Sequence, residues 1–129
     1  MKRGGIINAQ LSGALARLGH TDGLLICDAG LPLPSGPEVV DLAFEFGTPT
    51  FKTVLDGILR ELIVERATAA MEAAEGGYAT HQLLVDRLPV LDIVPHEELK
   101  RRGRGAKLVV RTGADIPYSN VILYCGVPF

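Results

Sequence analysis

Hydrophobic positions alternate along the chain between a spacing typical of helices and a run typical of buried strands. Four apolar residues after Asn8 recur at intervals of three and four, which predicts a helix that Asn8 caps and that Gly19 ends in a left-handed conformation. Residues 24–27 form a short unbroken apolar run, as expected of a strand covered on both faces. Glycines and prolines then crowd residues 29–37, so the strand leads into a stiff loop.

The same two patterns continue to the end of the chain. A second buried strand is predicted over 39–43, followed by a helix that Thr48 caps and Pro49 begins. Residues 61–75 are ambiguous, because Leu62–Val64 favours a strand while the alanines that follow favour a helix. The remaining predicted elements are a helix from Thr80 to Leu88, a strand over 90–94, a helix over 97–102, and strands over 107–111 and 120–125. Strands alternating with short helices indicate an α/β sandwich with a mixed or largely parallel sheet.

Composition and charge narrow the class of protein. A chain of 129 residues fits one domain, here 1–129, and its net charge of −2 provides no general attraction to nucleic acid or to an anionic membrane. The one basic run, residues 100–104, is interpreted as a solvated helix end rather than a phosphate or RNA patch. No apolar run approaches the roughly 20 residues of a membrane span. Cys27 and Cys125 lie in apolar runs without metal-ligand spacing, so a reduced, soluble, cytoplasmic protein is expected.

Candidate chemistry is confined to polar residues at the ends of elements. The chain has no glycine-rich nucleotide motif, no zinc motif and no nucleophile elbow, so no metal, cofactor or covalent nucleophile is expected. The polar residues that remain are His20, Asp28, His96, Lys100, Tyr118 and Asn120. Each could instead be a cap, a turn or a solvent-facing group. Together they offer the mixed hydrogen-bond donors and acceptors that suit a neutral polyol or sugar.

These stretches, taken together and in order, resemble the D-ribose pyranase family, small sugar mutarotases that are also related to fucose mutarotase. The most specific block is GHTDxxxxCDAGLPxP, which begins at Gly19. The matching stretches are 1–4, 17–22, 27–32, 96–100, 111–113, 117–120 and 125–127. One departure is the segment around Glu72 to Pro89, which is shorter than in typical members. Ser119 stands where a small residue, often alanine, is usual.

The resemblance implies a three-layer α/β/α fold without a cofactor, assembled into homopentamer rings and decamers, with sites near subunit contacts. It implies an isomerase that interconverts β-D-ribopyranose and β-D-ribofuranose and supplies the furanose to ribokinase. Of the candidate residues, His20 matches the family's proton donor. The positions that match sugar-binding residues or lie near the sugar are Asp28, His96, Lys100, Tyr118 and Asn120.

Acid–base chemistry then follows as a hypothesis. His20 donates a proton to the ring oxygen, Asp28 binds a sugar hydroxyl or steadies the histidine, and His96 or a bound water accepts the anomeric proton. Two other functions stay open: a fucose-type mutarotase that exchanges α and β anomers, and a sugar-binding protein without catalysis. Glu65 and Arg66 are interpreted as a surface pair without a role in the site.

Overall fold

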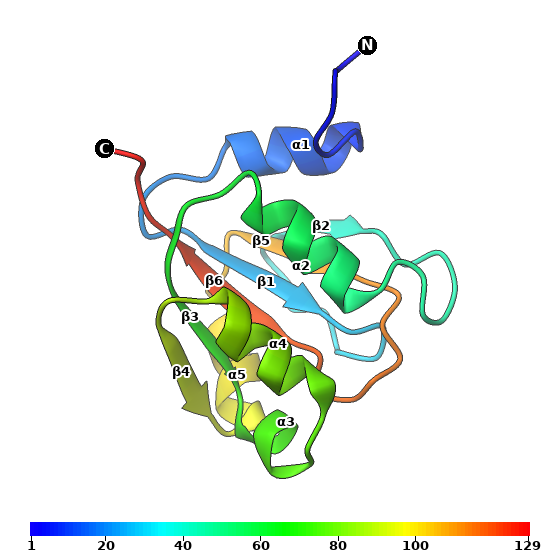
Figure 1. The fold of residues 1–129 in the computed structure, drawn as a ribbon, viewed down its shortest axis with the longest axis vertical. Coiled ribbons are helices and arrows are strands. Elements are labelled where there is room, and N and C mark those ends of the chain that lie inside the picture. The colour runs from blue at the N-terminus through cyan, green and yellow to red at the C-terminus, as the bar shows by residue number, and fades with distance from the viewer.

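A six-stranded sheet forms the centre of the molecule, and the computed structural model describes residues 1–129 (Figure 1). The strands are β1 (Gly23–Cys27), β2 (Glu38–Asp41), β3 (Val64–Ala70), β4 (Leu91–Val94), β5 (Leu108–Arg111) and β6 (Val121–Cys125). Their order across the sheet is β2-β5-β1-β6-β3-β4. Only β6 runs antiparallel to its neighbours, so the prediction of a mixed, largely parallel sheet is confirmed.

The strand directions give the sheet two chemically different edges. The five parallel strands all end at one edge, which we call the carboxyl edge, and begin at the other, which we call the amino edge. Because β6 runs the opposite way, it begins at the carboxyl edge and ends at the amino edge. Loops that follow parallel strands are therefore neighbours of the segment that precedes β6.

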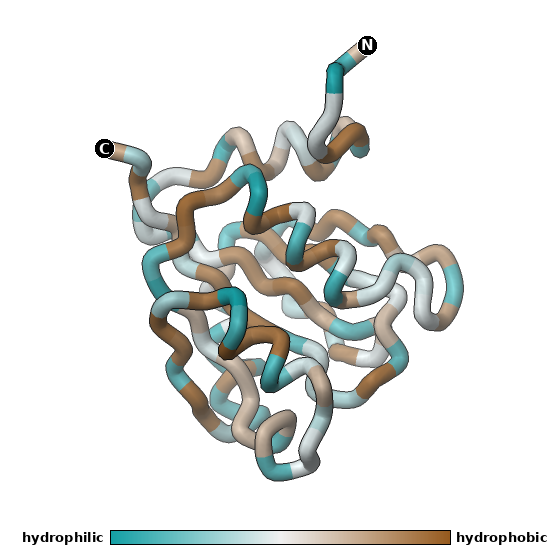
Figure 2. Tube along the Cα trace, in the orientation of Figure 1, coloured by the Kyte–Doolittle hydropathy of each residue, from teal (hydrophilic) through white to brown (hydrophobic).

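Helices cover both faces of this sheet, which confirms the three-layer α/β/α sandwich. They are α1 (Ala9–Ala16), α2 (Phe51–Leu59), α3 (Met71–Glu75), α4 (Ala79–Arg87) and α5 (His96–Gly103). In the view of Figure 1, α2 and α4 lie in front of the strands and α5 lies behind them. Helices α1, α2 and α4 share a core of 19 buried residues with one face, while α5 packs Leu99 into a second cluster of 8 on the other. Figure 2 shows hydrophobic colouring along the central strand β1 and on parts of helix α2, which lies in front of it.

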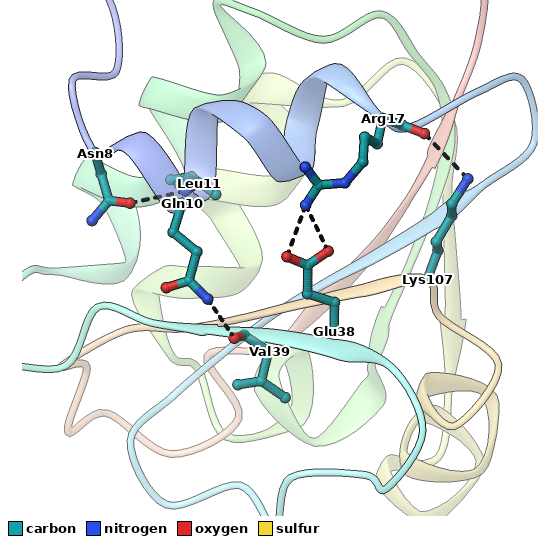
Figure 3. Close-up of polar contacts among 7 residues, drawn as sticks. All are labelled: Asn8, Gln10, Leu11, Arg17, Glu38, Val39 and Lys107. Carbon is teal, nitrogen blue, oxygen red and sulfur yellow. Dashed lines mark hydrogen bonds and ion pairs between the residues drawn. The ribbon is translucent and has the colours of Figure 1, made fainter.

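The first helix begins as predicted and ends differently. The Asn8 side chain accepts a hydrogen bond of 2.8 Å from the Leu11 N–H, as Figure 3 shows. The expectation that Gly19 is a left-handed cap is wrong, because α1 already ends at Arg17 in a right-handed conformation. The left-handed residue of this turn is Thr21, with φ of 70°.

Two predicted boundaries fail where the second strand and second helix meet. The strand predicted over 39–43 is β2, which ends at Asp41 and pairs only with β5, so it is an edge strand in which Val40 alone is buried. The cap of α2 is Thr50, whose hydroxyl accepts from the backbone N–H of Thr53, and Thr48 lies outside the helix. A pair of valines gives the same sequence pattern in an edge strand as in a central strand.

The ambiguous segment 61–75 is a strand followed directly by a short helix. Strand β3 takes its four buried positions from small residues at 67–70, which pack closely between β6 and β4. The expectation that Thr80 caps α4 is wrong: Thr80 lies inside the helix and is buried. Its hydroxyl pairs with the hydroxyl of Ser119 at 2.8 Å, which gives the serine at position 119 a partner.

Candidate active site

A buried pair of polar side chains forms the centre of the carboxyl edge. Asp28 follows β1 and Asn120 precedes β6, so the antiparallel pairing of these strands brings the two residues together. The Asn120 amide donates to Asp28 Oδ2 at 2.9 Å, and the backbone N–H of Asp28 donates to Asn120 Oδ1 at 3.0 Å. The Gly30 N–H donates to Asp28 Oδ1 at 3.0 Å. This reciprocal arrangement fixes the carboxylate while its oxygens keep acceptor capacity for a ligand hydroxyl.

The last residue of β5 and the residue that follows it hold the loop that carries Asp28. The Arg111 guanidinium donates to the Ala29 carbonyl at 2.9 and 3.2 Å, and to Asp41 Oδ2 at 2.9 Å. The hydroxyl of Thr112 donates to the Cys27 carbonyl at 2.9 Å. The loop is therefore tied to the sheet on both sides of Asp28, which keeps the carboxylate in one place.

Two aromatic residues and a histidine adjoin the buried pair. The rings of His96 and Tyr118 meet edge to face, with centroids 5.2 Å apart and planes at 82°. The Tyr78 ring lies 5.9 Å from Tyr118. Tyr118 adopts a left-handed backbone with φ of 62°, which turns the chain just before Asn120. His96 Nδ1 is buried and has no hydrogen-bond partner within the chain.

Glu72 is a residue of this site that the sequence did not reveal. Both of its carboxylate oxygens accept from the backbone N–H of His96, at 2.9 and 3.0 Å. This N–H is the first of α5, and the dipole of the helix also favours a negative charge at this end. Glu72 thus joins α3 to the start of α5 and fixes the backbone from which His96 projects.

Lys100 lies one helical turn beyond His96 and faces an adjacent hollow. Its ammonium pairs with Glu97 at 2.6 Å, which holds the pKa of that carboxyl below its ordinary value. The hollow, of about 730 Å³, lies between α5 and the loop over residues 31–35. Arg101 and Arg102 both pair with Glu98, so part of the positive charge of the basic run is compensated within its own helix, in keeping with a solvated helix end.

A second hollow of about 250 Å³ opens directly beside the Asp28 loop. It is lined by residues 28–30, by Phe46 and by residues 114–117. The Phe46 side chain is exposed above it. The carboxyl edge therefore offers both a fixed carboxylate and open space next to it.

His20 does not belong to this group within one chain. It precedes β1 at the amino edge, whereas Asp28 follows β1 at the carboxyl edge, and a five-residue strand separates such positions by roughly 15 Å or more. Asp28 of the same chain therefore cannot steady His20, and that part of the hypothesis is wrong for a single chain. The carboxylate beside His20 is Glu65, with 3.2 Å between His20 Nε2 and Glu65 Oε2. The expected Glu65–Arg66 pair does not form, because Arg66 lies 3.9 Å over the Tyr124 ring.

Three further features of the structure concern metal binding, membrane spans and the cysteine thiols. Nowhere do three or more His, Cys, Asp or Glu side chains gather where they could share a metal ion. None of the helices is both long and apolar enough to span a membrane. The thiols of Cys27 and Cys125 are free and buried, and burial raises the pKa of Cys27 to about 12.

Known proteins match this chain over its whole length. The model of the RbsD / FucU transport protein family matches residues 1–128. D-ribose pyranase 1 of Rubrobacter xylanophilus is 67% identical over 129 residues, which cover all of both chains. The structure of Bacillus subtilis RbsD complexed with D-ribose superposes with a TM-score of 0.95 at 39% identity, covering all of both chains. The fucose mutarotase of Streptococcus pneumoniae in complex with L-fucose shares the fold, with a TM-score of 0.72 at 20% identity over 95% of each chain. The chain therefore belongs to the RbsD / FucU transport protein family.

Proposed function

We propose that this protein is a D-ribose pyranase, an isomerase that interconverts β-D-ribopyranose and β-D-ribofuranose. The observation that carries the proposal is the buried Asp28–Asn120 pair beside His96 and Tyr118, a set of fixed donors and acceptors suited to sugar hydroxyls. The likeness to a ribose-bound relative at 39% identity over the full length supports ribose as the sugar. Tyr118 and Asn120 orient the hydroxyls, and Asp28 accepts a hydrogen bond from one of them.

Opening of the sugar ring and closure of the new ring each require two proton transfers. When the pyranose opens, the bond between C1 and the ring oxygen breaks, and the ring oxygen takes a proton from an acid. The anomeric hydroxyl loses its proton to a base while its electrons form the aldehyde. Rotation and attack by a different hydroxyl reverse these steps and close the furanose. One well-placed acid or base contributes roughly 10² to 10⁴-fold to such a reaction.

His20 is the proposed acid and His96 the proposed base. The His20 imidazole is exposed, so it can reach a sugar oxygen and deliver a proton to it. The His96 ring lies against Tyr118, and a nitrogen of this ring accepts the anomeric proton directly or through a water. Lys100 lies within the same helix one turn away and binds a hydroxyl at the rim of the site.

The separation of these two histidines requires a second copy of the chain. His20 lies at the amino edge, and the sugar-binding residues lie at the carboxyl edge of the same sheet. A complete site therefore forms where the amino edge of one copy meets the carboxyl edge of another. Such a head-to-tail contact repeats around a ring when its rotation closes, which supports assembly into homopentamers and, from two rings, decamers.

Exposed apolar side chains at both edges support this contact. Near the amino edge these are Ile63, Val127 and Phe129, which are 51%, 37% and 99% exposed. Near the carboxyl edge they are Phe44, Phe46 and Ile116, which are 83%, 83% and 46% exposed. Apolar groups that flank polar residues on a surface are typical of an interface between proteins.

Saturation-transfer NMR on ribose tests the activity directly. We expect the protein to accelerate exchange between pyranose and furanose signals and His20→Ala to lose about 100-fold of that acceleration. Exchange at the rate found in water alone, with ribose still bound, would make the protein a sugar-binding protein without catalysis. Faster exchange of the anomers of fucose than of the ring forms of ribose would identify a fucose-type mutarotase instead.

Co-expression of two inactive variants tests the shared site. His20→Ala lacks the acid, and Asp28→Asn lacks the sugar-binding carboxylate while keeping its shape. In mixed rings about a quarter of the contacts join an intact amino edge to an intact carboxyl edge, so about a quarter of the activity should return. Mixed assemblies that stay inactive, or a protein that sediments as a monomer while active, would contradict the shared site.

The product and the free thiols suggest the cellular setting. The furanose would serve a ribokinase, the enzyme class that phosphorylates this ring form. Two free, buried thiols fit a reducing compartment, so we infer that the protein works in the cytoplasm. Fractionation of cells that express the native gene, followed by immunodetection, tests the location.

A further inference from the structure

We propose that Glu65 is the positioning residue of His20 and that it makes Nδ1 the nitrogen that exchanges a proton with the sugar. The inference rests on the proposed function of His20. Glu65 Oε2 lies 3.2 Å from His20 Nε2. A carboxylate oxygen accepts hydrogen bonds, so Nε2 carries the hydrogen of this contact. Nδ1 is then the ring nitrogen that can gain and lose a proton.

A β-bulge places Glu65 at this point. Val64 pairs with Cys125 and Arg66 pairs with Tyr124, so two steps along β3 correspond to one step along β6. Glu65 is the extra residue, outside the regular ladder. Bulges redirect side chains and are common beside active sites. Without the bulge, the alternation of strand side chains would place position 65 differently with respect to its neighbours.

The residue after β6 is Gly126, which lies beside Ile63 and Glu65. A Cβ on Gly126 would lie 3.4 Å from the Glu65 Cβ, 3.5 Å from Oε2 and 3.1 Å from Cγ2 of Ile63. The last of these distances is tighter than ordinary packing allows. A side chain at position 126 would therefore crowd Ile63, whereas its contacts with Glu65 would be ordinary ones.

The turn that carries His20 is held rigidly, although its side chain is exposed. The Thr21 N–H donates to the Cys125 carbonyl at 2.8 Å, and the Gly19 N–H donates to Asp22 Oδ2 at 2.7 Å. Lys107 donates to Asp22 Oδ2 at 2.7 Å and to the Arg17 carbonyl at 3.2 Å, the second of which appears in Figure 3. The Lys107 ammonium and the Gly19 N–H hold the pKa of Asp22 below its ordinary value. A fixed backbone leaves rotation of the imidazole as the main freedom, and Glu65 removes it.

The two ring nitrogens of His20 have different roles in the proton transfer. In the acid form, Nδ1–H donates its proton to the ring oxygen while Nε2–H stays on Glu65. In the neutral form, Nδ1 has a lone pair and can take the proton back when the furanose closes. One nitrogen therefore keeps its hydrogen throughout, and the other completes the cycle.

Two variants at position 65 test this inference. Glu65→Ala removes the acceptor, whereas Glu65→Gln keeps an oxygen that accepts from Nε2–H at the same length. In protein labelled with ¹⁵N-histidine, and assigned with His20→Ala, we expect neutral His20 to be the Nε2–H tautomer in the native protein and in Glu65→Gln. In Glu65→Ala we expect a mixture, with kcat lower by about tenfold and KM unchanged. Glu38→Ala is the matched control, because it removes a similarly exposed glutamate whose partner is Arg17 and not His20 (Figure 3).

Separate outcomes address the inference and the proposed function. A native tautomer and full kcat in Glu65→Ala would overturn the role of Glu65, and so would a Glu65→Gln variant as slow as Glu65→Ala. If the native protein fails to accelerate ribose exchange, the proposed function fails, while the tautomer measurement still reports whether Glu65 holds Nε2–H.

Discussion

The carboxyl edge and the amino edge of the same sheet are built in opposite ways. At the carboxyl edge the polar groups are buried and bonded to one another, as in the Asp28–Asn120 pair. At the amino edge the backbone is fixed but the side chain proposed as the acid, His20, is 53% exposed. The polar groups of the first arrangement already have partners within the chain, whereas the proposed function gives the second its partner only in another copy.

This difference indicates how stability and function divide between the two edges. Substitutions at the carboxyl edge should cost folding free energy together with activity, since buried polar groups lose their partners. Substitutions at the amino edge should affect activity with little change in folding, because exposed side chains contribute little to stability.

Among these changes, Asn120→Ala at the carboxyl edge should lower the stability of the fold most. It leaves the Asp28 N–H and Oδ2 without their partners in a buried place, so the free energy of unfolding should fall by about 2–4 kcal/mol. Urea denaturation measures the loss. Asn8→Ala is the matched amide control, an exposed helix cap whose removal should cost only about 1 kcal/mol. Equal losses in the two variants would contradict a buried, cooperative pair.

His20→Ala is the corresponding change at the amino edge. We expect the free energy of unfolding to equal that of the native protein to within about 0.5 kcal/mol. The same variant should show the roughly 100-fold loss of ribose exchange. Denaturation and exchange measured on one preparation give both values. A clear loss of stability would show that His20 is part of the folded framework and would remove the contrast between the edges.

Glu72→Ala should sharpen the comparison, because it acts at the carboxyl edge through the backbone. Without its carboxylate the N–H of His96 loses both acceptors, and we expect kcat/KM to fall by about tenfold. Glu75→Ala, an exposed glutamate on the same helix, should leave kcat/KM unchanged. An equal fall in both variants would indicate that α3 is disturbed as a whole and that Glu72 has no special part.

The smallest expected effect is a loss of folding stability in acid, from Asp22 in the turn at the amino edge. The lowered pKa of Asp22 means that the folded protein holds the ionised carboxylate more strongly than the unfolded chain does. The contribution is present above the ordinary aspartate range and is lost as the pH falls through the lowered pKa. For a partly exposed ion pair we expect about 0.5 kcal/mol. Comparing urea midpoints of the native protein and Lys107→Met between neutral and acid pH measures it; identical pH slopes would refute this assignment.

The sequence predicted the central elements because their signals are local. The run 24–27 is apolar throughout since both faces of β1 are covered, and Asn8 caps a helix through a bond three residues away. The edge position of β2 could not be predicted, because which strand pairs with which depends on contacts distant in sequence. The same limit explains the false prediction for residues 39–43.

The site was predictable in composition and not in geometry. Asp28, Tyr118 and Asn120 meet because they lie at strand ends on one edge, which strand order determines. His20 is near Asp28 in sequence, yet the strand between them places it at the opposite edge. Glu65 and Glu72 carry no local signal, since a bulge against β6 and a contact 24 residues away define their partners.

The left-handed Thr21 has a consequence for anyone who would make this protein more heat-resistant. A β-branched residue at φ of 70° costs about 1–2 kcal/mol relative to glycine or asparagine in that conformation. Thr21→Asn is therefore an inviting stabilising change on thermodynamic grounds alone. Yet Thr21 adjoins His20, and strained residues beside functional groups commonly exchange thermal tolerance for a defined geometry. Selection of variants for melting temperature alone would favour a change at this position and would put the catalytic rate at risk.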